Sequence, residues 1–253
     1  MTLTCRTTSC PLTGNPTYTW YKNGQIVTVK TSTYSVLPNA KDSYSCAVKG
    51  HEDLHSPAVC VQYQYCNRMT YTNRRMCVLK GSTVDMSCTY DSGYNRVKSS
   101  LWFSPKRSAS WTNKLTPEDL TRDPGYAGRV KYPDKERWRY KDPCILRITD
   151  LREEDSAEYR FTFKTDNFEW GHSFPGTTLS VTGLQVKVTP AAEGQRTLTC
   201  STTCILTDNP TYIWYKNGQV VTENTSLYSV LPNAVDSYFC AVKGHEGLSS
   251  PAC

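Results

Sequence analysis

A long internal repeat constrains this chain more than any other feature of its sequence. The segment Pro16–Gly50 aligns without gaps with Pro210–Gly244, and the two copies differ at only seven positions. Copies that similar are expected to adopt the same fold, and a fixed repeat of this kind indicates an array of structural units. We therefore interpret the chain as the product of a recent duplication of a two-domain unit and expect it to belong to a longer array.

Each copy carries the residues that define an immunoglobulin sandwich. In this fold two cysteines join the facing sheets, and a tryptophan between them in sequence packs against the bridge. The matching residues are Cys5, Trp20 and Cys46, then Cys200, Trp214 and Cys240. Tyr44 and Tyr238 lie two residues before the second cysteine, at the tyrosine-corner position. An Asn-Gly pair follows each tryptophan strand, which predicts a tight type I′ hairpin turn.

The longer segment between the two copies predicts a third domain of the same class. Short alternating or β-branched runs predict strands at Ser82–Tyr90, Ser100–Ser104, Gly128–Tyr132, Cys144–Ile148 and Gly176–Thr182. The extra length between Trp102 and Cys144 is typical of a variable-type domain. The sequence thus predicts an all-β chain of three tandem immunoglobulin-like β-sandwich domains, the middle one variable-type. The expected boundaries are 1–64, which we expect to be incomplete at its N-terminus by comparison with the third domain, then 67–182 and 183–253.

The 12 cysteines indicate disulfide bonds and an oxidising, extracellular environment, since zinc-type CxxC pairs are absent. Within the repeats we expect Cys5–Cys46 and Cys200–Cys240. The second cysteines of each repeat recur at matching places, which favours Cys10–Cys60 and Cys204–Cys253. Cys88 has Phe161 at its usual partner position, and Cys144 is the nearest candidate. Cys66 and Cys77 remain, and they could pair with each other, bridge two domains or bind elsewhere.

Composition and motifs exclude several classes of function. The net charge of +6 is too diffuse for a nucleic-acid interface, although it suits contact with acidic glycans or acidic protein surfaces. No apolar run is long enough to cross a membrane, so an anchor would lie outside this segment. Neither a catalytic triad, a metal-binding helix motif nor a phosphate loop occurs, and the sequence predicts no enzyme activity, cofactor or metal site.

The middle domain resembles the siglecs, the sialic-acid-binding immunoglobulin-like lectins of leukocytes. The resemblance is carried by a strand that opens with Cys144 in the pattern CxLxIxDL, by Phe161 in place of the usual cysteine, and by the GTTLSVT strand from Gly176. The short, doubly bridged flanking domains are similar to those of the B-cell inhibitory co-receptor of that family and its relatives in non-mammalian vertebrates. The resemblance implies that Cys88 and Cys144 form a bridge within one sheet.

The resemblance also implies where a ligand would bind. Siglecs hold the sialate carboxylate with one arginine in a Tyr-x-Phe-Arg motif, and here Thr162 stands at the arginine position. A guanidinium gives two charge-assisted hydrogen bonds where a hydroxyl gives one neutral one. Arg160 and Lys164 flank Thr162 on the same expected outward face and could substitute for the arginine. Trp170 stands where the family places a tryptophan against the sugar, although an ordinary edge aromatic is the alternative.

Two surface elements complete the sequence-based expectations. Asn224-Thr225-Ser226 is the sequon of an N-linked glycan, which predicts an exposed acceptor at Asn224. The segment Trp111–Tyr126 predicts a loop with a short helical turn, either a solvated surface or a partner-binding element. We expect a leukocyte cell-surface receptor of siglec type for cell recognition and the regulation of B-cell signalling. Its ligands would be sialoglycans or protein counter-receptors, with a spacer array without lectin activity as the alternative.

Overall fold

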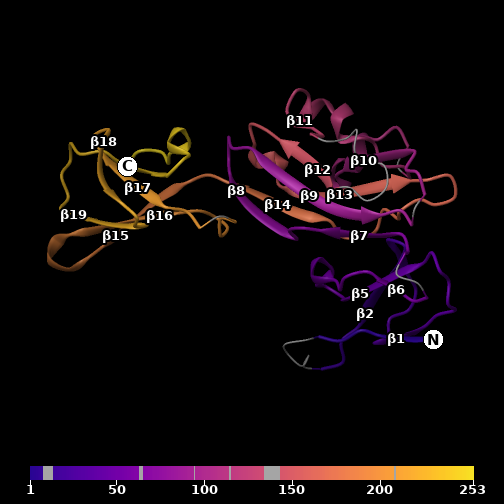
Figure 1. The fold of residues 1–253 in the computed structure, drawn as a ribbon. Helices are drawn as coiled ribbons and strands as arrows, with labels where there is room; N and C mark the ends of the chain where they lie inside the picture. The colour runs from indigo at the N-terminus through magenta and orange to yellow at the C-terminus, as the bar shows by residue number, and fades with distance from the viewer. Residues whose placement is uncertain (8–13, 63–64, 94, 114, 134–142, 208) are drawn as a thin grey trace. The chain divides into compact units, whose positions relative to one another are not determined.

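The computed structural model describes residues 1–7, 14–62, 65–93, 95–113, 115–133, 143–207 and 209–253 (Figure 1). Its regular elements are short β-strands and single turns of 3-10 helix, and the predicted all-β class is confirmed. Packing divides the chain into two compact units. The first comprises Met1–Arg74, Asp85–Ile148 and Ala157–Thr178, and the second comprises Arg75–Val84, Thr149–Ser156 and Leu179–Cys253. The division into three domains at the expected boundaries stays a prediction.

The N-terminal repeat, here called the first domain, has two small sheets. One pairs β1 with β4, and the other has the order β3-β2-β5-β6. The elements are β1 (Thr2–Thr4), β2 (Tyr18–Lys22), β3 (Gln25–Val27), β4 (Thr33–Ser35), β5 (Ser43–Val48), η1 (Glu52–Leu54) and β6 (Val59–Cys60). Positive φ angles of 53° at Asn23 and 76° at Gly24 give the predicted type I′ turn between β2 and β3.

The C-terminal repeat, the third domain, reproduces this local structure. Its sheets have the orders β15-β16-β19 and β18-β17-β20. The elements are β15 (Gln185–Pro190), η7 (Ala192–Gly194), β16 (Arg196–Ser201), β17 (Tyr212–Lys216), β18 (Gln219–Glu223), β19 (Leu227–Val230), β20 (Tyr238–Val242) and η8 (Glu246–Leu248). The indole nitrogen of Trp214 donates to the Thr225 carbonyl at 3.1 Å, as that of Trp20 donates to Thr31 at 2.8 Å.

The middle domain has two four-stranded sheets, with the orders β10-β13-β14-β8 and β11-β12-β9-β7. Its strands are β7 (Arg68–Tyr71), β8 (Arg75–Leu79), β9 (Val84–Asp91), β10 (Ser99–Phe103), β11 (Val130–Lys131), β12 (Pro143–Ile148), β13 (Ala157–Lys164) and β14 (Thr177–Thr182). Its 3-10 turns are η2 (Pro105–Ser110), η3 (Leu120–Arg122), η4 (Pro124–Tyr126) and η6 (Glu153–Asp155). Between β10 and β12 the described residues thus form mainly 3-10 turns, where additional variable-type strands were expected.

Three disulfides agree with the sequence prediction: Cys5–Cys46, Cys200–Cys240 and Cys88–Cys144. The third joins β9 to β12, which are neighbours in one sheet and lie side by side in Figure 1. The bridge therefore runs within a sheet. Trp102, which would pack on an inter-sheet bridge, is fully buried against the ring of Phe161 at 5.6 Å. An aromatic side chain thus fills the place of the missing cysteine.

The assignments Cys10–Cys60, Cys204–Cys253 and Cys66–Cys77 were wrong, while the alternative of a bridge between two domains holds for Cys77. Cys60 pairs with Cys66, six residues away, and not with Cys10, which lies outside the described residues. Cys204 pairs with Cys77 of β8, so neither Cys66–Cys77 nor Cys204–Cys253 forms, and Cys253 is an exposed free cysteine. The predictions Cys10–Cys60 and Cys204–Cys253 assumed that the second disulfide of each small domain lies within that domain. Thr207 instead holds the Cys204 loop against β8, because its hydroxyl and backbone N–H bond the backbone of Cys77 at 2.8 and 3.0 Å.

Within the first unit, the first domain packs on the middle domain through an aromatic cluster, defined here as Tyr21, His55, Tyr71, Phe163, Trp170 and Phe174. All six side chains are buried. Phe174 lies at its centre, with its ring 4.2 Å from His55, 5.5 Å from Tyr21 and 5.3 Å from Trp170. Burial of so much aromatic surface makes this contact a large source of stability in the unit.

The hairpin turn of the first domain completes this contact. The backbone N–H of Gly171 donates to the Asn23 carbonyl at 2.9 Å. Gly24 approaches the indole of Trp170 so closely that an added Cβ would lie 2.6 Å from Cε2. Gly24 therefore serves two purposes, since it supplies the positive φ of the turn and leaves room for the tryptophan.

We expect Gly24→Ala to destabilise the protein more than Gly218→Ala does. Both substitutions force a side chain into a left-handed backbone, which costs about 1–2 kcal/mol. Gly218 has a φ of 81° and nothing within 4 Å of its added Cβ, so it isolates that cost. At Gly24 the clash with Trp170 should add about 1–3 kcal/mol of overpacking. Urea denaturation of the intact chain measures both, and equal losses would contradict the packing role of Gly24.

His55 makes the same contact sensitive to pH. Burial, followed by the nearby Arg74, lowers its pKa to about 4, and the hydrogen bond to the Ser56 backbone and the charges of Asp53 and Glu158 only partly oppose that effect. Its Nδ1 contacts the Ser56 carbonyl at 2.9 Å, and its buried Nε2 has no hydrogen-bond partner in the described structure. The folded state therefore holds a neutral imidazole, and protonation would place a charge among aromatic rings.

We expect the unfolding free energy to fall as the pH drops from 6.5 towards 4. In that window the unfolded chain binds a proton that the folded chain rejects, so the stability is present above pH 6.5 and is lost below it. The loss should reach about 1–2 kcal/mol at pH 5.5. Urea midpoints at several pH values measure it. His55→Phe should remove this component and His51→Gln, at an exposed site, should keep it; an unchanged slope in His55→Phe would refute the assignment.

Candidate recognition site of the middle domain

Strand β13 carries three of the four residues expected to contact a ligand. It pairs antiparallel with β10 in continuous register, from Ser99 opposite Lys164 to Phe103 opposite Arg160. Its inward residues Tyr159, Phe161 and Phe163 are fully buried, as the alternation predicted. The other face carries Arg160, Thr162 and Lys164, and the structure places these three in different environments.

Thr162 is almost fully buried, although it lines a small hollow that also reaches Lys164. Only 6% of its surface is exposed, and its hydroxyl donates to the Trp170 carbonyl at 2.8 Å. The position at which siglecs carry the sialate-binding arginine is therefore covered by the chain segment that follows β13. A larger side chain here would have to displace that segment.

Arg160 is held by neighbouring protein groups. Its guanidinium makes a two-pronged contact with the Glu158 carboxylate, at 3.0 and 2.8 Å. Its Nη1 donates to the His172 carbonyl at 2.7 Å. Glu158 in turn accepts from the Gly176 N–H at 2.7 Å. With its charge paired in this way, Arg160 orders the loop between β13 and β14 and has little capacity left for an acidic ligand.

Lys164 is the most exposed member of the expected set. Its side chain is 60% exposed and lies 3.8 Å from Glu169, which also contacts His172 at 3.1 Å. Such an exposed pair contributes little to stability and can exchange partners. Of the four residues named from the sequence, Lys164 alone is available in the way that was expected.

Trp170 does not present its ring to a ligand. It is 1% exposed and stacks on Phe163 at 6.1 Å within the aromatic cluster. The expected contact with a sugar is therefore corrected: the indole fills the contact with the first domain. Sequence reasoning missed this because nothing in the residues near Trp170 indicates that Gly24, far away in sequence, packs against it.

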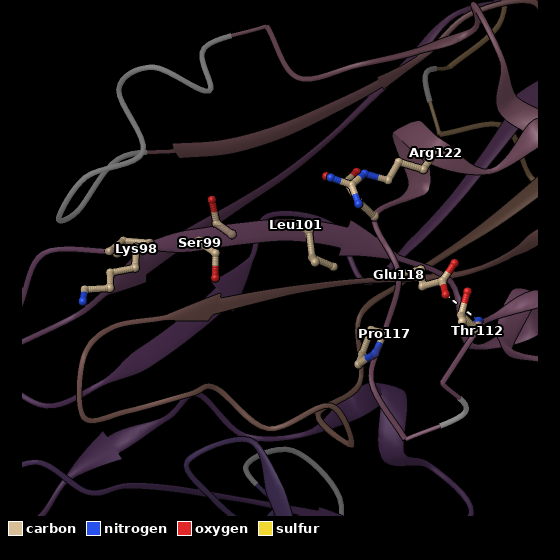
Figure 2. A pocket seen from close by; sticks show the side chains of 10 residues that line it. Lys98, Ser99, Leu101, Thr112, Pro117, Glu118 and Arg122 are labelled. Carbon is tan, nitrogen blue, oxygen red and sulfur yellow. Dashed lines mark hydrogen bonds between the residues drawn. The ribbon is translucent and has the colours of Figure 1, made fainter.

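A groove of about 740 Å³ lies beside β10, and Figure 2 shows the side chains that line it. Its lining residues are Val97, Lys98, Ser99, Ser100, Leu101, Thr112, Pro117, Glu118, Asp119 and Arg122. In the view of Figure 2, Arg122 and Pro117 lie on opposite sides of the strand. A smaller hollow of about 210 Å³ adjoins it, shares Ser99, Ser100, Leu101 and Pro117, and reaches Lys164.

The wall of this groove comes from the segment that was expected to be a loop with a short helical turn. Asp119 begins η3 by accepting the Thr121 N–H at 3.0 Å, which sets the direction of Arg122. Glu118 accepts the Thr112 N–H and so closes the loop on itself. No motif in the sequence marks Arg122 as a site residue, because a lone arginine in a polar loop is typical of an ordinary protein surface.

Other expected surface features have simple surroundings. Asn224 is exposed in the turn between β18 and β19, with a φ of 69°. No group of three or more metal-ligating side chains is found among the described residues. Within the same residues, no helix has the length and hydropathy that crossing a bilayer would require.

We expect Arg160→Ala to destabilise the protein and Lys164→Ala to leave its stability nearly unchanged. The first removes hydrogen bonds between charged groups and leaves half-buried Glu158 without its cation, which costs about 1–3 kcal/mol. The second removes one exposed pair, worth less than about 0.5 kcal/mol. Thermal denaturation of the two variants compares them. Similar small effects would mean that Arg160 is as available to a ligand as Lys164.

The comparisons with known proteins bear on this same domain. Residues 78–183 match the sequence model of a family described as B-cell receptor CD22-like, first Ig-like. No curated protein matches the chain. The matched segment contains the within-sheet bridge, β10, β13 and both hollows, so the family assignment rests on the domain that carries the candidate site.

The match agrees with the resemblance seen in the sequence and with the all-β structure. Immunoglobulin-like receptor domains of this kind lie outside the cell or at its surface, and they are in general not enzymes. Through residues 78–183 the chain is similar to the first immunoglobulin-like domain of CD22-like B-cell receptors, which supports an immunoglobulin-type receptor ectodomain.

Proposed function

We propose that this ectodomain segment recognises a protein counter-receptor on another cell or on the same cell, and that it does so through the groove beside β10. In this proposal the receptor belongs to leukocytes, contributes to adhesion and to the regulation of B-cell signalling, and is anchored in the membrane by a part of the protein outside this segment. The first and third domains space and orient the middle one.

The environment of Thr162 is the observation that carries the proposal. A siglec-type site needs a guanidinium that reaches solvent at this position, and here a buried hydroxyl donates to the Trp170 carbonyl. Arg160 is paired with Glu158, and Trp170 is buried in the aromatic cluster. Three of the four groups that could hold a sialylated sugar thus have structural roles, which supports a ligand of another class.

Binding of a sialoglycan remains the second candidate, and exposed Lys164 is the feature that favours it. A single ammonium is a point charge that attracts a carboxylate without fixing its orientation. Such a site would be weak and would need several copies to hold a cell surface. We also propose Asn224 as a glycan acceptor, since it lies exposed in a turn of the third domain.

The test is binding of the intact chain, displayed as a multivalent conjugate, to leukocytes treated beforehand with neuraminidase or with a protease. We expect protease to abolish binding and neuraminidase to leave it within about twofold, since a protein ligand does not depend on terminal sialic acid. An Arg122→Glu conjugate should bind several-fold less than the original, and Lys131→Glu, on the other sheet, should bind equally.

Loss of binding after neuraminidase would overturn the proposal in favour of the sialoglycan. In that case Lys164→Ala, and not Arg122→Glu, should reduce binding on a sialoglycan array. Absence of binding to all leukocytes tested would favour the spacer alternative.

A further inference from the structure

The groove follows the edge of a sheet and not one of its faces. Five consecutive residues, Val97 to Leu101, line it, and the last three of them belong to β10. Side chains of consecutive strand residues point to opposite faces, so a hollow on one face would contact only every second one. Contact with Ser99, Ser100 and Leu101 places the groove along the strand's own hydrogen-bonding edge. β10 is indeed the outermost strand in the order β10-β13-β14-β8.

The backbone of Ser100 faces this groove. The Trp102 N–H donates to the Tyr132 hydroxyl at 3.2 Å, and that hydroxyl contacts the Trp102 carbonyl at 3.4 Å. Both backbone groups of Trp102 therefore point away from β13. In an antiparallel ladder, residues two apart direct their N–H and C=O to the same side. The N–H and C=O of Ser100 consequently point outward, and no partner for them is found in the described part of the chain.

Tyr132 determines where the open edge ends. Its hydroxyl occupies the backbone groups of Trp102 and also donates to Asp119 at 2.6 Å, which fixes it in place. Within the described ranges, no side chain caps the stretch before Trp102 in this way. Exposed strand edges pair readily with other chains, and here the loop carrying Pro117 lines the groove beside that edge.

The charges around the groove favour one kind of side chain on that partner. Arg122 is exposed and has no ion pair among the described residues. The two carboxylates of the groove already accept hydrogen bonds from the protein: Glu118 from the Thr112 N–H, and Asp119 from Thr121 and Tyr132. Lys98, at the other end, is paired with Asp166. The groove therefore offers one unpaired cation.

We propose that the counter-receptor contributes an extended segment that adds as a strand to the edge of β10 and places an acidic side chain against Arg122. This inference rests on the proposed function and adds the mode of binding. Backbone hydrogen bonds at Ser100 hold the segment, and contacts between its side chains and the groove give specificity. Arg122 fixes its register, because a carboxylate there forms a charge-assisted pair.

The experiment uses a phage-displayed library of random linear 12-residue peptides, selected on the immobilised intact chain. Synthetic versions of the enriched peptides are then tested on variants and by amide hydrogen exchange. We expect the enriched peptides to share an Asp or Glu and to bind Arg122→Glu at least tenfold more weakly than the original chain. Lys131→Glu should bind them equally. Bound peptide should slow exchange of the Ser100 amide at least tenfold.

Ser100→Pro is the second variant, since it deletes the outward N–H without removing a hydrogen bond to β13 and edge strands tolerate proline. It should lose at least tenfold in affinity while its thermal midpoint stays near that of the original chain. Enriched peptides that bind Arg122→Glu as tightly as the original, or that leave Ser100 exchange unchanged, would overturn the proposal, as would a selection that enriches no peptide.

Results that overturn strand addition can be distinguished from results that overturn the proposed function. Protease-sensitive, neuraminidase-resistant binding to leukocytes together with no peptide effect at Ser100 would exclude strand addition and keep a protein counter-receptor. Sialic-acid-dependent binding to leukocytes would exclude the counter-receptor, whatever the peptides do.

Discussion

The packing of Trp170 against the Gly24 turn is the contact on which the rest of the first unit depends. It draws together a hairpin of the first domain, the segment after β13 and the ring of Phe174. The segment that delivers Trp170 also supplies the carbonyl that binds Thr162. The same contact thus joins two domains and covers much of the position at which siglecs carry their sialate-binding arginine.

The local sequence predicted the secondary-structure elements well, but it predicted the contacts between domains poorly. The Asn-Gly turns, the Cys…Trp…Cys patterns and the alternation along β13 depend on neighbours in sequence or on a fixed spacing, so the residues alone predicted them. The pairing of Cys77 with Cys204 depends on which loop reaches β8, and no local pattern encodes that. The repeat led to wrong pairings for Cys60 and Cys204. Their partners, Cys66 and Cys77, lie outside the repeated segments, in or next to the unrepeated middle domain.

The candidate site divides in the same way. The period-two rule placed Arg160, Thr162 and Lys164 on one face of β13 correctly, but it could not say what covers that face. Thr162 is buried by a segment that returns over the strand, and Arg160 is paired with a carboxylate only two residues away. Nothing in the local sequence marks Arg122 or the outer edge of β10, because their proposed role depends on which neighbours they lack among the described residues.

The outer edge of β10, proposed to bind a partner strand, belongs to a strand that neighbouring contacts hold in place. β10 pairs with β13 over its whole length, and β13 is fixed at one end by the aromatic cluster and at the other by the Tyr159–Tyr126 hydroxyl contact of 2.8 Å. A partner strand that docks on a preordered edge orders only itself, which lowers the entropic cost of binding. Thr162 and Trp170, through their hydrogen bond and ring contact, thus help to hold the strand beside which the groove lies.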